Sequence, residues 1–98
     1  MKNFKVAVTR LGGVDLLLVP VDGMDGRSER DQQIITDELQ NRANMTGLTG
    51  LVVPVWRAGE GNGMKFRAPE SLHTTLMALN MDWVLSNLNK IVRWDGRR

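Results

Sequence analysis

The amino-acid sequence predicts a small single-domain α/β (α+β) fold, in which four to five strands form one sheet and two to three helices pack on it. Three patterns carry this prediction: a hairpin-like alternation over residues 4–21, a helical stretch between two apolar strands, and a Gly-rich loop between the second of these strands and one further short strand. With 98 residues and 42% hydrophobic side chains, the chain can build one core. We therefore predict one compact domain over residues 1–98, with a short basic tail at residues 95–98.

Composition limits the protein classes to which this chain can belong. A net charge of +2 with 24% charged residues is ordinary for a soluble globular protein and does not indicate nucleic-acid binding. The absence of cysteine excludes a disulfide framework and thiolate metal sites in this chain. The longest apolar run, residues 16–21, is far shorter than the roughly 20 residues of a membrane helix, and the N-terminus has no signal-peptide pattern. We expect a soluble cytoplasmic protein without a membrane partner.

The first element is a β-hairpin with a two-residue turn at Gly12 and Gly13. This turn puts Leu11 opposite Val14 and Arg10 opposite Asp15. The same register places Phe4, Val6 and Val8 opposite Val21, Val19 and Leu17, which gives an apolar ladder on one face. Because proline has no N–H, the ladder should stop where Pro20 faces Lys5.

A helix follows from about Ser28 to Arg42. Ser28 is a typical N-cap, with Asp31 in the position of a capping-box acid, and Glu38 and Arg42 form a favourable pair on the solvent side. The apolar stripe of this helix is Ile34, Ile35, Leu39 and Ala43. The next strand, residues 51–56, is apolar on both faces, which predicts a parallel crossover covered by helices, although Pro54 argues against a fully central strand.

The loop at residues 58–63 predicts a second hairpin, with Arg57 opposite Met64 and Trp56 opposite Lys65. The last third of the chain leaves alternatives open. Leu72, Leu76 and Leu79 repeat at helical spacing, and Asp82 can cap a second helix with Val84, Leu85 and Leu88 facing inward. Residues 90–94 then form either a last strand or the end of one long helix.

Two echoing Val-Pro-Val runs, residues 19–21 and 53–55, each lead into a Gly-rich acidic loop. If both end parallel strands, their loops leave the same edge of the sheet, where ligands of α/β proteins commonly bind. The candidate ligand residues there are Asp22, Asp25, Gly26 and Glu60. Their carboxylates suit a small ligand or a divalent cation such as Mg²⁺ or Ca²⁺, the one cofactor this sequence suggests, but Asp and Gly are also what tight turns use.

No residue is assigned a catalytic role, and whether the protein is an enzyme is left open. The single histidine, His73, lies among helical leucines, and the chain contains no metalloprotease, nucleophile-elbow or P-loop motif. An enzyme is therefore possible but has no support in the sequence.

The leading hypothesis is a non-catalytic interaction domain of otherwise unassigned function, which engages a protein partner or itself. Residues 22–38 carry six acidic side chains against two arginines, while the rest of the chain has a charge of +6, and such asymmetry favours association. The predicted interaction surface consists of Trp56, Lys65, Arg67, Arg93 and Trp94. The alternatives are the ligand site described above and weak nucleic-acid binding by the basic sheet face, which lacks an RNP-like aromatic pair. The tryptophans can equally be ordinary core residues.

Overall fold

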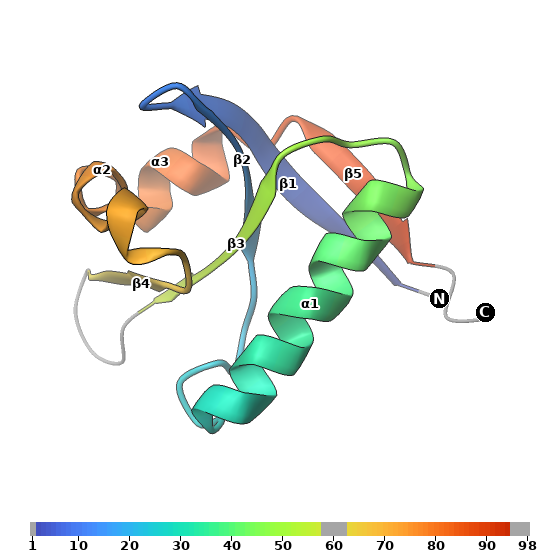
Figure 1. Cartoon of the computed structure of the whole chain (residues 1–98), viewed down its shortest axis with the longest axis horizontal. Coiled ribbons are helices and arrows are strands. Elements are labelled where there is room, and N and C mark those ends of the chain that lie inside the picture. The colour runs from blue at the N-terminus through green and yellow to red at the C-terminus, as the bar shows by residue number, and fades with distance from the viewer. Residues whose placement is uncertain (1, 58–62, 95–98) are drawn as a thin grey trace.

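Five strands form one mixed sheet in residues 2–57 and 63–94, the part of the chain that this computed structural model describes (Figure 1). The side chains of residues 2, 3, 93 and 94 also lie outside the description. The strands are β1 (Lys2–Leu11), β2 (Val14–Pro20), β3 (Leu51–Arg57), β4 (Met64–Phe66) and β5 (Lys90–Trp94), in the spatial order β4-β3-β2-β1-β5. The predicted fold class is confirmed: a hairpin, a β-α-β crossover and a second hairpin, with helices packed on the sheet.

The N-terminal hairpin has the predicted register. Leu11 pairs with Val14 and Arg10 with Asp15, and the Arg10 guanidinium lies 3.8 Å from the Asp15 carboxylate. Both turn glycines have positive φ, 59° at Gly12 and 79° at Gly13, as a type I′ turn requires. The paired residues end at Ala7 and Leu18, the last pair before Lys5 and Pro20, as the missing N–H of Pro20 predicted. The opposite edge of β1 pairs with β5.

The crossover helix α1 (Glu29–Met45) begins as predicted. The Asp31 N–H donates to the Ser28 hydroxyl at 3.1 Å. The helix ends about one turn later than predicted, and Ile34 is 56% exposed, so the predicted apolar stripe is wrong at this position. The residues that face the sheet are spaced by four, namely Ile35, Leu39 and Ala43. The Glu38–Arg42 pair forms at 3.5 Å, but the Arg42 side chain is only 17% exposed and so is not on the solvent side.

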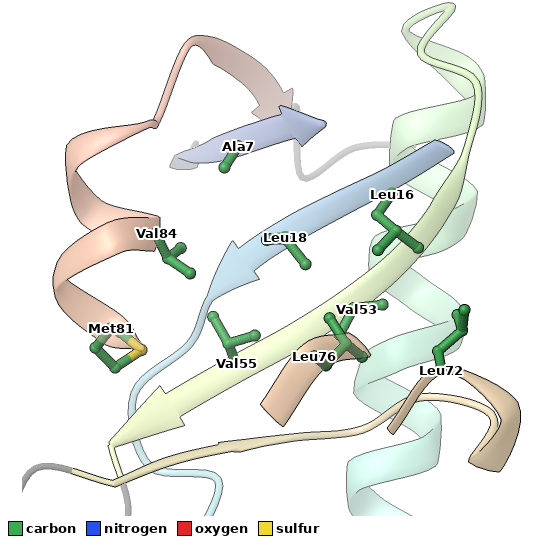
Figure 2. Close-up of a cluster of buried hydrophobic side chains, with 9 residues drawn as sticks. All are labelled: Ala7, Leu16, Leu18, Val53, Val55, Leu72, Leu76, Met81 and Val84. Atoms are coloured by element: carbon green, nitrogen blue, oxygen red, sulfur yellow. The ribbon is translucent and has the colours of Figure 1, made fainter. Parts of the chain in front are cut away.

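Helices cover both faces of the sheet, which explains why its central strands are apolar on both faces. On one face, α1 packs over a cluster made of Val6, Leu17, Val19, Leu39, Ala43, Val52 and Val92. On the other face lie the 3-10 helix η1 (Glu70–Leu72), α2 (His73–Met77) and α3 (Met81–Ser86). Figure 2 shows the cluster beneath them, with Leu16, Leu18 and Val53 from the sheet meeting Leu76 and Val84 from the helices.

The C-terminal third resolves into short helices followed by a strand, so the alternative of one long helix is wrong. Asn80 has an extended backbone and caps α3, accepting from the Trp83 N–H at 2.8 Å, and Asp82 does not serve as the cap. Val84 is fully buried, whereas Leu85 is 45% exposed. Ile91 lies in β5, which pairs antiparallel with β1.

Among the residues that the structure describes, no helix combines the length and apolar character needed to span a membrane.

Candidate functional site

The two Val-Pro-Val runs lie side by side at the carboxyl ends of the parallel strands β2 and β3. Val19 pairs with Pro54 and Pro20 with Val55, so the following loops leave the sheet at the same edge, as predicted. Consecutive residues of a strand point their N–H and C=O groups to opposite sides. Because the Val21 N–H donates to the Val55 carbonyl at 2.9 Å, Pro20 faces the β1 side instead. The ladder between β2 and β3 therefore needs no N–H from Pro20.

Pro54 likewise faces away from β2. Its carbonyl accepts from the Arg67 N–H at 3.1 Å, so its nitrogen faces the chain that continues β4. Val52 lies two residues before Pro54 on β3. If the hairpin continued in the same register, Val52 would face Pro69, which also has no N–H to donate. The hairpin of β3 and β4 therefore has only three residue pairs, and β3 is internal near Val55 but forms an edge near Val52.

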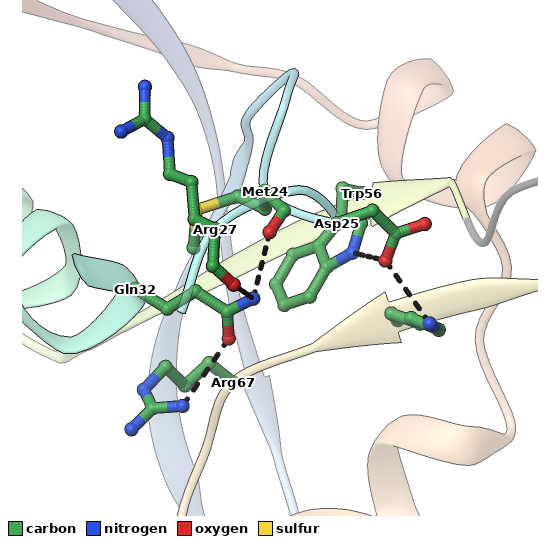
Figure 3. Close-up of polar contacts among 7 residues, drawn as sticks. Met24, Asp25, Arg27, Gln32, Trp56 and Arg67 are labelled. Carbon is green, nitrogen blue, oxygen red and sulfur yellow. Dashed lines mark hydrogen bonds and ion pairs between the residues drawn. The ribbon is translucent and has the colours of Figure 1, made fainter. Parts of the chain in front are cut away.

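Asp25 fixes the loop after β2 to the second hairpin. Figure 3 shows its carboxylate facing the Trp56 indole, whose Nε1 donates to Asp25 Oδ1 at 3.0 Å. The Lys65 ammonium donates to the same oxygen at 3.1 Å. The predicted pairing of Trp56 with Lys65 is confirmed, and their side chains meet at this carboxylate. A cation would have to compete with both donors for Asp25.

The start of α1 holds the same loop from its other side. The Gln32 side-chain amide donates to the Met24 carbonyl at 2.8 Å and to the Arg27 carbonyl at 3.3 Å (Figure 3). The Met24 side chain is fully buried. These contacts explain the acidic Gly-rich loop in structural terms, as a segment folded onto the carboxyl edge of the sheet.

Two of the predicted ligand residues, Asp22 and Asp25, border the same hollow. This hollow has a volume of ≈ 370 Å³ and also contains the cationic Arg57. Gly26 is exposed, and Glu60 lies outside the described residues. In residues 2–57 and 63–94, no group of three His, Asp or Glu side chains is placed to hold a metal ion.

The predicted interaction surface is divided between opposite edges of the sheet. Trp56 is only 7% exposed, and Lys65 and Arg67 lie beside it on and after β4. Arg93 and Trp94 belong to β5, at the other end of the strand order, and their side chains lie outside the description. The division arises because β5 pairs with β1 and not with β4.

A larger groove of ≈ 660 Å³, which the sequence reasoning missed, lies between α1 and residues 66–73. It opens where Pro54 and Pro69 end the second hairpin and the chain leaves β3. Its walls include Asp37 from α1, Arg67 and His73, whose ring lies edge-on to Phe66 with 5.2 Å between the ring centroids. The two prolines that flank this hairpin were the available sequence signal.

The edge of β3 inside this groove is closed by a side chain. The Val52 N–H donates to Gln40 Oε1 at 2.8 Å, and Gln40 Nε2 donates to the Gly50 carbonyl at 3.0 Å. A neighbouring parallel strand would bond to the Gly50 carbonyl and to the Val52 N–H, on either side of Leu51. The side-chain amide of Gln40 makes both of these hydrogen bonds in its place.

The side-chain amide of Asn89 likewise bonds to the edge of β1, in the part of that strand that extends past β5. The Val8 N–H donates to Asn89 Oδ1 at 3.0 Å, and Asn89 Nδ2 donates to the Val8 carbonyl at 3.3 Å. These bonds reproduce a hydrogen-bonded antiparallel pair. Together with Gln40, they cover stretches of edge that could otherwise bind another strand.

The chain matches no protein-family model, no curated protein and no solved structure.

The outer edge of β5 differs from the covered edges. In a hairpin with a two-residue turn, Leu11 and Val14 form a hydrogen-bonded pair, so odd-numbered residues of β1 face β2 and even-numbered ones face β5. Phe4 therefore bonds to its partner Val92, and the alternate residues Ile91 and Arg93 direct their backbone groups outward. Among the described residues, no strand lies beyond β5.

Proposed function

We propose that the protein is a non-catalytic interaction domain that associates by strand addition at the outer edge of β5, with a second copy as its partner. The observation that carries this proposal is the outer edge of β5, beyond which no strand lies among the described residues, whereas side-chain amides cover parts of β3 and β1. An exposed strand edge is a template for another strand. The side chain of Ile91, the second residue of β5, is 61% exposed.

The sequence of β5 suits antiparallel pairing with itself. A two-fold axis at Val92 places Ile91 of one copy opposite Arg93 of the other, and these are the residues whose backbone groups face outward. The two pairs would supply four backbone hydrogen bonds. Lys90 would face Trp94 of the other copy, so no like charges oppose each other.

β4, at the opposite end of the sheet, suits self-pairing less well. It has three residues, Met64–Phe66, and a two-fold axis at its centre would oppose the Lys65 side chains of the two copies. Like charges directly opposite each other destabilise a strand pair. The charge pattern therefore favours β5 as the edge that associates.

Arg93→Pro tests the proposal because it removes an outward N–H without removing a bond to β1. A symmetric dimer would lose two hydrogen bonds, each with a net value of about 0.5–1.5 kcal/mol, so the dimer should dissociate about 5- to 150-fold more readily. Sedimentation equilibrium measures the dissociation constant of the dimer. Arg93→Gln is the matched control, since it removes the charge and keeps the N–H.

Amide hydrogen exchange identifies the surface that associates. We expect the amides of Ile91 and Arg93 to become protected as the protein concentration rises, while that of Val92 is protected throughout by β1. A protein that remains monomeric at millimolar concentration would overturn the proposal. So would a dimer in which the amides of Ile91 and Arg93 still exchange freely.

A further inference from the structure

The groove between α1 and residues 66–73 contains an arginine held by neutral partners. Arg67 is half-buried, its Nε donates to Gln33 Oε1 at 3.1 Å, and one terminal nitrogen lies 3.5 Å from Gln32 Oε1 (Figure 3). In the described part of the chain, no carboxylate lies within ion-pair distance of Arg67. A guanidinium partly withdrawn from water without an anion beside it is suited to bind a carboxylate.

A negative charge lies one amide group away from this arginine. Gln33 accepts from Arg67 through its oxygen and donates to Asp37 Oδ1 through its nitrogen at 2.8 Å. Asp37 would repel a phosphate or another multiply charged anion bound at Arg67. The pair of charges instead favours a ligand that carries both signs.

The groove also offers an acceptor on its floor. The Val52 N–H points into the groove toward Gln40, and the carbonyl of the same residue points to the same side. Pro69, which would face Val52 if the hairpin continued, cannot donate to it. This carbonyl is therefore placed to accept from a ligand N–H.

We propose that this groove binds a free α-amino acid with an apolar side chain. In this arrangement Arg67 holds the α-carboxylate, while Asp37 and the Val52 carbonyl accept from the α-ammonium. In an amino acid the carboxylate and the ammonium are bonded to the same carbon. This short separation matches the short separation of Arg67 and Asp37, which are bridged by the side-chain amide of Gln33 alone. Leu51, Phe66 and Pro69 supply apolar surface for the side chain.

NMR titration of the labelled full chain with L-leucine tests the proposal. We expect saturable shifts of the Gln33, Phe66 and Arg67 amides. 4-Methylpentanoate, which lacks the ammonium, and 3-methylbutylamine, which lacks the carboxylate, should bind at least about tenfold more weakly, because each loses one charged contact.

Two variants separate a role in binding from a role in the fold. Arg67→Met and Asp37→Asn should each weaken leucine binding at least about tenfold while the amide spectrum away from the groove is retained. Arg57→Met is the matched control, because Arg57 pairs with Asp82 outside the groove and its loss should leave binding unchanged.

Three results would overturn the proposal: no saturable shift up to about 20 mM leucine, equal binding of either analogue, or full binding by both variants. Because the groove and β5 lie at opposite edges of the sheet, these results leave the proposed association untouched.

Discussion

At the scale of single residues, polar side chains connect elements that the backbone ladders leave apart. Asp25 joins the loop after β2 to Trp56 and Lys65, and Gln40 and Asn89 each supply two hydrogen bonds to a strand edge. The polar groups of Asp25 and Asn89 are one methylene from the backbone, whereas the longer Gln40 side chain is held by its two hydrogen bonds. Substitution of any one of these side chains should remove two hydrogen bonds.

Asp25→Ala should lower the free energy of unfolding by about 1–2 kcal/mol. The main reason is that the Trp56 indole N–H would lose its acceptor in a part-buried position, while loss of the exposed Lys65 ion pair adds little. Urea denaturation measures the change. Asp22→Ala, at an exposed neighbour, is the control, and an equal effect of both substitutions would contradict the role assigned to Asp25.

At the scale of secondary-structure elements, prolines set the lengths of the ladders. Pro20 and Pro54 direct their nitrogens away from the β2–β3 ladder, and Pro69 prevents β4 from extending along β3. β3 consequently combines a paired half with an edge half. The edge half depends on a side chain from α1.

Gln40→Met should destabilise the protein by about 1–3 kcal/mol, because the Val52 N–H and the Gly50 carbonyl would both lose a partner. Hydrogen exchange of the Val52 amide should accelerate more than that of Val53, whose backbone faces β2. Asn41→Ala, on an exposed position of the same helix, is the control for helix propensity. Unchanged exchange at Val52 would show that Gln40 does not protect this edge.

Elements specified by neighbouring residues could be predicted from the sequence. The hairpin register follows from Gly12 and Gly13, and the start of α1 follows from Ser28. The C-terminal third was less predictable, because its helices are short and the position of β5 beside β1 is a contact between distant parts of the chain. The pairing of β5 with β1 also places Arg93 far from Lys65 in the strand order, although the sequence analysis had assigned both residues to one interaction surface.

The candidate sites show the same limit. The loops at the carboxyl edge were predicted, because two parallel strands must end there together. The use of Asp25 as an acceptor for Trp56 was not predicted, since the two residues are 31 positions apart. The groove near Arg67 forms because β4 stops after Phe66. To predict this end, one would need to know which residues face Pro54 and Pro69 in the hairpin.

At the scale of the whole molecule, one sheet divides the interior into two apolar clusters. Both clusters depend on β2 and β3, whose side chains alternate between them. Loss of packing on one face should therefore loosen the other face as well. This coupling predicts a single cooperative unit, as expected for one domain of this size.

Far-UV circular dichroism and tryptophan fluorescence should report the same thermal midpoint, because Trp83 on α3 and the long helix α1 depend on the same strands. Leu18→Ala, in the cluster beneath α3, should lower the stability by about 2–4 kcal/mol and move both midpoints together. Two separated transitions would contradict a single domain over residues 1–98.

The pairing of β1 with β5 has a consequence for synthesis of the protein. Lys2 pairs with Trp94, so the partner of the first strand is translated last among the described elements. On the ribosome, β1, β2, α1 and β3 can assemble early, but the edge of β1 near Phe4 remains unpaired until residues 90–94 emerge. A nascent chain stalled before Lys90 would therefore expose that edge to neighbouring chains, which could pair with it.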